Sequence, residues 1–487
     1  MSVVDVLHLE GSLWSRSRRG QRDAGTWVVA YLVLQIGIPA RLVLPGLGGA
    51  GRPAVILGLG LLVWWLIAHL SPDLVPLGRQ PLRWTLCVFV ATVLASYVLG
   101  LDRGLRPLES RGAGRYLLGL GSLLGVSLIT ADGLRDAASL RRVLRWLVGM
   151  CTFSAVLGIL QFRNIDLAGY IHPPGLIYNQ ELVGIRLRGG PGFNRVYGTA
   201  QHYIVFGVTL AMSLPVALHL ALTDAHPRMR RRWWACAVVI AAAIPFSISR
   251  AGALGLFVSF VVLCAAWPRR LRVKRILVAV IGVGAFRLVV PGVLGTIKSA
   301  FLNFNNDPSI LNRRSDYAAV GGYIRDRPYF GRGPGTFAPE IYRVLDNQFL
   351  GSVIELGFIG TTALLGIFLG AWCQSRIVRK RAVEEELAHL GQALAASVAV
   401  ALVASFTFDS LAFPTFAGLF FVVVGLCAAL WRHATITHPL DVAARQRGTL
   451  VAHATNILRG VRTRDSVVAE STRVEKERGA AGPAPSF

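Results

Sequence analysis

Residues 200–232 read AQHYIVFGVTLAMSLPVALHLALTDAHPRMRRR, and this stretch decides the fold class. Its first part, 200–223, is mostly apolar, and an arginine cluster follows at Arg228–Arg232. A helix needs about 20 apolar residues to cross the hydrocarbon core of a bilayer, which is about 30 Å thick. Basic residues beside such a block favour the cytoplasmic side. The stretch therefore predicts a membrane-spanning helix that ends in the cytoplasm.

The same pattern recurs through the 487 residues of the chain. The composition is 53% hydrophobic and 16% charged, with a mean hydropathy of +0.53, whereas soluble domains have about 25% charged residues. The apolar blocks predict twelve spans, with boundaries good to about four residues. They are 27–44, 53–70, 83–101, 114–131, 143–162, 200–223, 233–249, 252–267, 275–294, 347–372, 388–407 and 414–431. We therefore expect an all-α integral membrane protein.

The net charge of +25 comes from short arginine clusters between the apolar blocks. A single basic patch would indicate nucleic-acid binding, and the scattered clusters argue against that class of function. An N-terminus on the inside puts nearly all the clusters in cytoplasmic segments, although the outer segment Asp102–Gly112 also carries several arginines. We expect a cytoplasmic segment 1–26, a membrane domain 27–431 and a flexible cytoplasmic tail 432–487.

Several classes of site are absent from the sequence. The six cysteines lie in or beside apolar blocks without metal-site spacing, so we interpret them as small buried hydrophobic residues. The first 23 residues are polar and basic and do not form a cleavable signal peptide, so the first span is expected to direct insertion. No Walker loop, H-E-x-x-H motif or Asp-rich outer segment occurs. A metal-independent function without a cofactor is therefore expected.

Two predicted outer segments, 163–199 and 295–346, are longer than the other connections. Loops longer than about 15 residues in a compact protein usually carry a function or are disordered. Both contain tyrosine and phenylalanine in amphipathic stretches, which argues against disorder. We expect a short amphipathic helix over Tyr317–Tyr329, lying on the membrane surface.

Arg250 is the first candidate for a functional side chain. It lies in PFSISRAGALG, at the outer junction between two apolar blocks with almost no loop between them. An arginine at membrane depth is costly unless it faces a cavity or a partner. It either extends to the membrane surface as an ordinary interface residue or binds an anionic group.

The longer outer loop holds a second set of candidates, in a place where the topology rule does not call for cations. Guanidinium groups match phosphate oxygens with paired hydrogen bonds, so a lipid diphosphate at the outer leaflet would fit them. The alternative is salt bridging to Asp316, Asp326 and Glu340 or to lipid headgroups, which suits Arg325 and Arg343. The candidate phosphate ligands are Arg313, Arg314, Arg325, Arg327 and Arg332.

Asp346 stands where this loop re-enters the membrane, in VLDNQFLGSVIELG. A carboxylate there is placed to accept a proton from an attacking hydroxyl group. The alternative is a helix N-cap, a role that Asn347 could share. Asn347 is also a candidate for binding the substrate. Further upstream, Arg195, Thr199 and His202 lead into the sixth span and are candidates for binding a sugar or a phosphate, although a single histidine at a helix start is more often structural.

Four segments carry a resemblance when they are taken together. They read RVYGTAQH from Arg195, SISRAGALG from Ser247, RRSDYAAVGGYIRDRPYFGRGPGTF from Arg313 and DNQFLGSVIELGFIG from Asp346. In order and placement they resemble the O-antigen ligase and polymerase superfamily, which attaches or extends lipid-carried glycans outside the cytoplasmic membrane. The third resembles its run of an arginine, an aromatic residue four positions later and Pro-x-x-Gly-x-Gly-x-Gly-x-Phe. The resemblance is best over about 190–370.

The resemblance implies a fold similar to the GT-C membrane glycosyltransferases, in a bacterial inner membrane, and a polyprenyl-diphosphate-linked glycan donor. It implies that Arg250 and Arg313 bind the diphosphate, with Arg314 as the competing choice. Asp346 would position or deprotonate the acceptor hydroxyl, in a direct displacement that inverts the anomeric centre. Asp346 stands where ligases commonly have His, so the choice between ligase and polymerase stays open. The acceptor, a glycan, lipid or protein, is also open.

Two other classes of function remain open. Twelve spans with both ends inside are a common transporter layout, so a transporter or flippase is the main alternative. Transporters usually show repeated halves, and no matching halves are evident here. A non-catalytic assembly partner is the third possibility, and an activity assay would separate it from the first.

Overall fold

The computed structural model describes residues 24–70, 80–179, 195–290, 292–295 and 308–436, and the side chains of most of them. It divides into two units, Met1–Arg432 and His433–Phe487. The structure below is that of the first unit. Most of the predicted cytoplasmic segments 1–26 and 432–487 lie outside the described residues.

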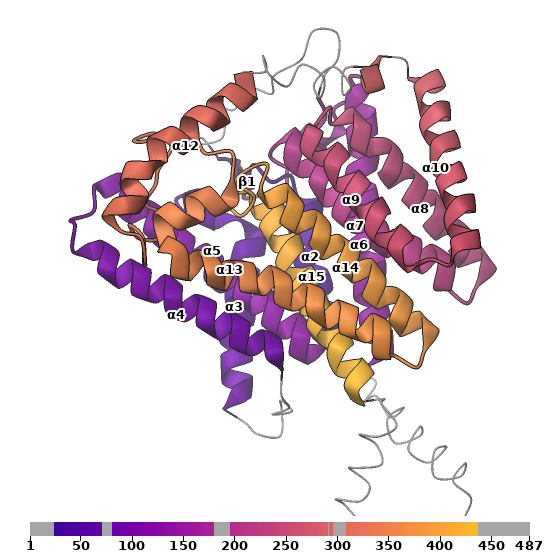
Figure 1. Cartoon of the computed structure of the whole chain (residues 1–487), viewed down its shortest axis with the longest axis horizontal. Helices are drawn as coiled ribbons and strands as arrows, with labels where there is room; N and C mark the ends of the chain where they lie inside the picture. The colour runs from indigo at the N-terminus through magenta and orange to yellow at the C-terminus, as the bar shows by residue number, and fades with distance from the viewer. Residues whose placement is uncertain (1–23, 71–79, 180–194, 291, 296–307, 437–487) are drawn as a thin grey trace, which may run out of the picture. The chain divides into compact units, whose positions relative to one another are not determined.

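Nearly all the described secondary structure is helical (Figure 1). The helices are α2 (Ala24–Leu32), continued by the π-helical turn η1 (Val33–Gly37), α3 (Pro53–His69), α4 (Pro81–Leu101), α5 (Pro107–Gly133), α6 (Ala137–Phe162), α7 (Tyr203–Thr223), α8 (Pro227–Phe246), α9 (Arg250–Ala266), α10 (Arg269–Val289), α12 (Pro308–Asp326), α13 (Gln348–Arg381), α14 (Glu385–Ser405) and α15 (Pro414–Ile436). Two short 3-10 turns are η2 (Gly48–Gly51) and η3 (Leu167–Tyr170), and two short strands are β1 (Leu42–Val43) and β2 (Ile177–Tyr178). Each of the twelve predicted spans coincides largely with a helix.

Seven of the described helices are long and apolar enough to cross a membrane: α4, α5, α6, α7, α13, α14 and α15. The segment Ala24–Gly37, α3 and α9 are apolar but shorter. Helices α8 and α10 begin with clusters of arginine. The prediction of an all-α membrane protein is therefore confirmed, while the number of twelve spans stays a prediction.

The first predicted span, 27–44, is wrong at its outer end. The helix stops at Gly37, and Ile38 has extended backbone angles, as expected for a residue before a proline. The chain then forms β1, in which Leu42 pairs with Tyr178 and Val43 with Ile177 of β2. The first outer loop is thereby tied to the loop that follows α6.

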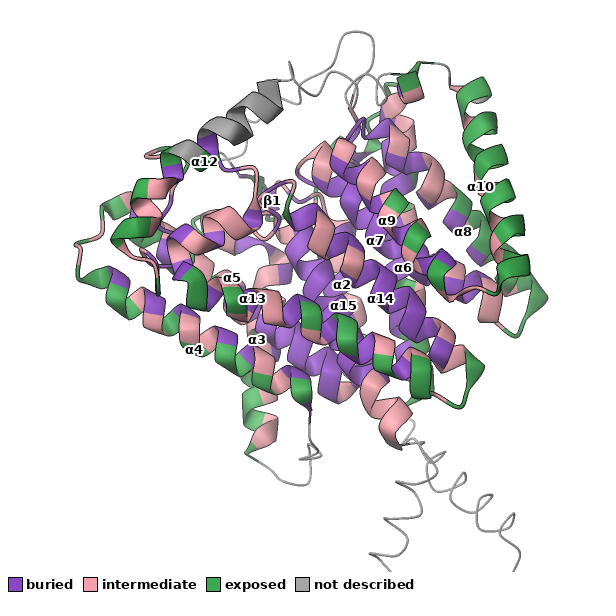
Figure 2. Cartoon of the chain, viewed as in Figure 1, coloured by how far each residue is buried: buried purple, intermediate pink, exposed green. Residues whose placement is uncertain are grey.

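Burial separates the helices into a central and a peripheral group (Figure 2). In α7 and α15, 89% of the membrane-length window is buried inside the protein, and in α14 78%. In α4 only 28% is buried, and large apolar side chains are exposed along both α4 and α10. An exposed apolar helix face is expected where the solvent is lipid, so α4 and α10 are suited to the bilayer boundary.

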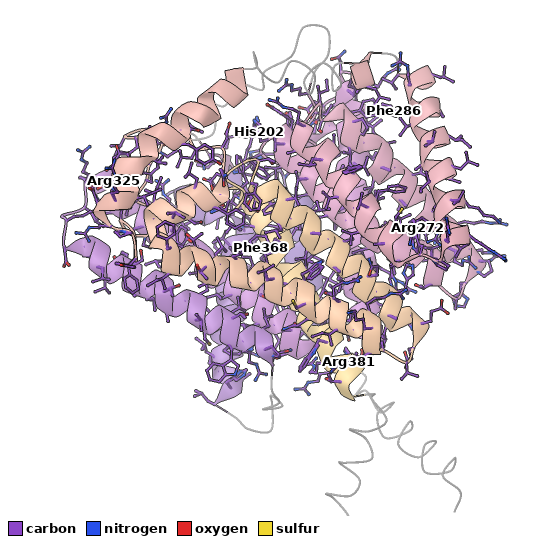
Figure 3. All side chains as sticks on the ribbon, viewed as in Figure 1. His202, Arg272, Phe286, Arg325, Phe368 and Arg381 are labelled. Carbon is purple, nitrogen blue, oxygen red and sulfur yellow. The ribbon has the colours of Figure 1, made fainter. Side chains whose placement is uncertain are left out.

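Ion pairs connect neighbouring segments at one end of the helix bundle. At this end, which we call the inner end after the predicted topology, arginine–carboxylate pairs join neighbouring segments: Arg83–Asp132 at 2.9 Å, Arg141–Glu386 at 2.6 Å and Arg145–Asp224 at 2.9 Å. The opposite, outer end carries α12, β1 and the first residues of α7 and α9. Figure 3 shows His202 and Arg325 at the outer end and Arg272 and Arg381 toward the inner one.

Two sequence interpretations need correction. All six cysteines are free, but Cys87 and Cys373 are exposed on helix surfaces, so the prediction that all are buried is wrong for these two. The loop helix expected over Tyr317–Tyr329 is α12, which begins at Pro308 and ends at Asp326. It ends there because Pro328 disfavours helical geometry in the residue before it.

Candidate active site at the outer end

The glycine-rich segment after α12 fills a break in helix α13. Gly357, with φ 69° and ψ −175°, interrupts the helix. The N–H groups of Arg332 and Gly333 donate to the carbonyls of Ile354 and Glu355, each at 2.9 Å. Beyond the break, two helix N–H groups donate to loop carbonyls at 2.8 and 3.2 Å. The loop therefore satisfies backbone groups that the break exposes, a requirement for irregular backbone at membrane depth.

The glycines of this segment are required by its backbone. Gly331, Gly333 and Gly335 have φ angles of 70°, 109° and 65°, a region that residues with a side chain rarely adopt. A Cβ atom on Gly331 would lie 2.4 Å from the carbonyl of Glu355. The spacing of the Pro-x-x-Gly-x-Gly-x-Gly motif thus follows from a close approach between loop and helix backbone.

Arg332, a predicted phosphate ligand, lies within a network of protein groups. It donates to the Tyr342 hydroxyl at 2.8 Å and lies 3.9 Å from the Glu109 carboxylate. The Tyr342 hydroxyl donates to Glu109 at 2.6 Å, and Arg103 pairs with the same carboxylate at 3.0 Å. These bonds tie the glycine-rich segment to the start of α5. Arg332 therefore has partners within the protein that do not depend on a bound ligand.

Other loop arginines also contact the protein. Arg327, predicted to bind substrate, donates to the carbonyl of Leu99 at 2.6 Å near the end of α4. Arg343 pairs with Asp316 at 2.9 Å, which confirms the salt-bridge alternative for that arginine. Arg325 is exposed at the end of α12.

Asn347, not Asp346, is the N-cap of α13. Its side-chain oxygen accepts from the N–H groups of Phe349 at 2.9 Å and Leu350 at 3.2 Å, and its amide donates to the Tyr317 hydroxyl of α12 at 3.1 Å. Asn347 thus occupies the cap position next to Asp346. Within the described part of the chain, the half-buried Asp346 carboxylate accepts no hydrogen bond.

Asp409 lies close enough to both Glu355 and Asp346 to be affected by their charges, and we call Asp346, Glu355 and Asp409 the carboxylate cluster. Asp409 lies in the short loop between α14 and α15, which the side chain of Gln348 holds by accepting from the N–H of Leu411 at 2.7 Å. Burial, with the facing charges of Glu355 and Asp346, raises the pKa of Asp409 to about 7. Among the described residues, no group of His, Cys, Asp or Glu side chains is arranged to hold a metal ion.

Asp409 was missed in the sequence. It occurs as a single acid between two apolar blocks, in TFDSLAF, which is an ordinary loop composition. The one available signal was an ionisable residue at the expected outer boundary of the last two spans.

Arg250 begins helix α9 after a tight turn. The Ser249 side chain caps the helix by accepting from Gly252 N–H at 3.3 Å. Ile248, just before it, has φ 46° and is 8% exposed. A β-branched residue in this region is strained, and such strain persists only where the surrounding structure enforces it. The turn fixes Arg250 at the outer end of the bundle.

The segment from Arg195 to His202 packs against this turn. The Val196 N–H donates to the carbonyl of Phe246 at 3.5 Å. A Cβ on Gly252 would meet the Cα of Gly207 at 3.2 Å, so α7 and α9 touch near their first turns. The structure therefore brings together the first two segments of the sequence resemblance.

Within this segment, Thr199 is structural. It is 2% exposed, and its hydroxyl donates to the Ser154 hydroxyl of α6 at 2.9 Å. Its carbonyl accepts from Ala40 N–H at 2.8 Å. Both interactions bind the segment to its neighbours, and the side chain faces the protein interior.

His202 is the N-cap of α7 and lies near two arginines. Its Nδ1 accepts from Ile204 N–H at 3.3 Å. Burial and the positive charges of Arg195 and Arg41 lower the pKa of His202 to about 4, so the ring is neutral at pH 7. Because Nδ1 is the acceptor, Nε2 carries the proton. We call Arg41, Arg195 and His202 the cation cluster, although His202 itself is uncharged; Arg250 begins the adjoining helix α9.

The two clusters are linked by aromatic contacts. The His202 ring lies 6.1 Å from that of Phe413, which lies 5.7 Å from Phe408. The carbonyl of Phe408 accepts from Gln348 N–H at 3.2 Å, two residues after Asp346.

Arg313 and Arg314 belong to helix α12, but their side chains lie outside the described residues.

A family described as O-antigen ligase matches residues 235–365. The match supports an O-antigen ligase or polymerase-like family for this part of the chain. This confirms the resemblance to the O-antigen ligase and polymerase superfamily. The matched region contains Arg250, Arg313, Asp346 and the glycine-rich segment, and it begins after Arg195–His202. It is shorter than the predicted 190–370.

A second family, described as PUCC protein, matches residues 335–454 and overlaps the O-antigen ligase domain at 335–365. No curated protein matches the chain. The O-antigen ligase match supports a membrane enzyme family that joins or extends glycans.

Proposed function

We propose that the chain is an inverting, metal-independent glycosyltransferase of the bacterial inner membrane. It transfers or polymerises a polyprenyl-diphosphate-linked glycan onto an acceptor hydroxyl at the outer membrane face. The observation that carries this proposal is the juxtaposition, at one end of the bundle, of a cation cluster and a carboxylate cluster. The first suits a diphosphate and the second suits an acceptor hydroxyl.

In the proposed reaction, the acceptor oxygen attacks the anomeric carbon from the face opposite the diphosphate. The bond between the anomeric carbon and the diphosphate oxygen breaks, its electron pair leaves with the diphosphate, and the configuration inverts. The hydroxyl proton passes to Asp346. This carboxylate is free of a capping role because Asn347 caps α13, so it is available as the base.

Arg250 and Arg313 are the proposed ligands of the leaving diphosphate. Its charge grows as the glycosidic bond breaks, so fixed cations bind the transition state more tightly than the ground state. Arg313 stands one helical turn before Tyr317 on α12, and residues four apart share a helix face. Tyr317 accepts from Asn347 at the start of α13, and the spacing of the family motif, an arginine four residues before the aromatic residue, favours Arg313 over Arg314.

Asp409 supports the same assignment. With a pKa of about 7, it is largely protonated below neutral pH. A neutral carboxyl group next to Asp346 lowers the repulsion that two ionised acids would feel. A protonated Asp409 donates a hydrogen bond to the acceptor glycan or to its neighbour.

The test is glycan transfer by purified, reconstituted protein with a polyprenyl-diphosphate-linked oligosaccharide as donor. Arg250→Ala and Arg313→Ala are each expected to reduce transfer by about 100- to 1,000-fold, with unchanged membrane insertion and melting temperature. Arg325→Ala, which alters an exposed arginine on the same loop, is the matched control and should retain activity. Normal transfer by both site variants would refute the proposed site.

A transporter or flippase is the second candidate, because a broken membrane helix such as α13 is typical of transporters. In transporters the break exposes backbone groups to a substrate or ion, whereas here loop backbone bonds the groups on both sides of it. Movement of a labelled solute or lipid-linked glycan across proteoliposomes, without any glycan transfer, would favour this candidate.

A further inference from the structure

Arg41 is a cation at the outer end of the bundle. In the sequence it falls inside the first predicted span, 27–44. Helix α2 and its π-helical turn end at Gly37, so Arg41 lies beyond the helix, immediately before β1. The residue is half-buried and thus reachable from outside the protein. Neither matched family region includes it.

The backbone around Arg41 is fixed on both sides. The N–H of Ala40 donates to the carbonyl of Thr199, and the carbonyl of Arg41 accepts from Asn179 N–H, each at 2.8 Å. The pairing of β1 with β2 continues this attachment. A loop held at both edges has less backbone freedom to lose on ligand binding.

The side chain of Arg41 points to the start of α7. Its guanidinium carbon lies 4.9 Å from the centre of the Tyr197 ring, and one terminal nitrogen donates to the carbonyl of Gln201 at 3.5 Å. Arg195 stacks similarly on Tyr203, at 4.6 Å. Stacking holds each guanidinium plane by its face and leaves edge N–H groups for an acceptor.

This arrangement concentrates positive charge without a matching acid. Among the described residues, neither Arg41 nor Arg195 forms an ion pair, and the buried Nε of Arg195 has no hydrogen-bond partner. The nearby Asp166 accepts instead from Tyr197 and Gln161. The first turn of α7 adds the partial positive charge of a helix N-terminus. Like charges held together in this way fit a polyvalent anion.

We propose that Arg41 binds one phosphate of the donor diphosphate, while Arg195 and the proposed ligands Arg250 and Arg313 bind the other. This inference rests on the proposed function and adds a binding residue from the first outer loop. A diphosphate offers two sets of oxygens, and each guanidinium fork matches one set. Arg41 is then a determinant of specificity for diphosphate over monophosphate lipids.

The experiment compares binding of a polyprenyl diphosphate and the polyprenyl monophosphate of the same chain length to the full chain in lipid nanodiscs. The wild-type protein should prefer the diphosphate. Arg41→Gln should weaken diphosphate binding by about 10- to 100-fold and leave monophosphate binding unchanged. Arg163→Gln, which changes an exposed arginine at the end of α6, is the matched control and should alter neither.

The outcomes separate the inference from the proposed function. If the wild type binds neither lipid, the proposed function is refuted. If the wild type prefers the diphosphate and Arg41→Gln retains that preference, only the role of Arg41 is overturned. If Arg41→Gln does not fold, Arg41→Lys keeps the charge without the fork, and full retention of the preference in that variant overturns the inference.

Discussion

At the scale of single residues, neighbours in the sequence have different tasks. Asn347 uses its side chain to cap α13 and to contact α12, whereas Asp346 next to it makes no described hydrogen bond. The sequence could not separate these roles, because both residue types suit a helix N-cap. Only the backbone geometry decides which residue occupies the cap position.

This division predicts opposite effects of two substitutions. Asn347→Ala should reduce stability by about 1 kcal/mol, the usual contribution of a cap. Asp346→Asn should leave the melting temperature unchanged and reduce glycan transfer by about 100- to 10,000-fold, the contribution of general base catalysis. Thermal unfolding and transfer rates of both variants check this. A loss of stability in Asp346→Asn with full activity would contradict it.

Asp409 predicts a dependence of stability on pH. Its pKa is about 7 in the folded protein and about 3.9 in an unfolded chain. Between these values the folded state holds a proton that the unfolded state has lost, so stability decreases as pH rises from about 4 through 7. Melting temperatures of the wild type at about pH 5 and pH 8 should therefore differ more than those of Asp409→Asn. Equal differences would contradict the assignment.

At the scale of elements, α13 and the glycine-rich segment form one unit. The sequence showed the spacing of the glycines but gave no sign that α13 is broken, because its apolar pattern runs through Gly357 without interruption. A helix break of this kind is stable only if other groups bond the exposed backbone. The partner segment lies outside the helix, so local periodicity cannot reveal it.

The unit predicts a contrast between two glycines. Gly331→Ala places a Cβ 2.4 Å from the Glu355 carbonyl at a φ of 70°, and should destabilise the protein by about 2–3 kcal/mol. Gly351, in helix α13, has open space around it, so Gly351→Ala should stabilise the protein by about 0.5–1 kcal/mol. Denaturation in the same detergent measures both. Equal stability of the two variants would argue against the observed insertion.

At the scale of the whole molecule, apolar blocks and arginine clusters predicted where helices form, because span length and charge placement are set by the bilayer itself. The way the outer segments pack is set by contacts between distant parts of the chain. Arg41 illustrates this: the sequence placed it inside a span, whereas Pro39 ends the helix and β1 pairs with β2 far downstream. The cation cluster therefore could be predicted only in part.

The predicted topology, with both termini in the cytoplasm, has a direct test. Tyr170 is 85% exposed beyond α6 at the outer end, and Val383 is 76% exposed between α13 and α14 at the inner end. In a variant whose six cysteines are replaced by serine or alanine, Tyr170→Cys should react with a membrane-impermeant maleimide on intact spheroplasts. Val383→Cys should react only after the membrane is permeabilised. The reverse pattern would invert the topology and place both charged clusters in the cytoplasm, where a donor that is displayed at the outer leaflet does not reach them.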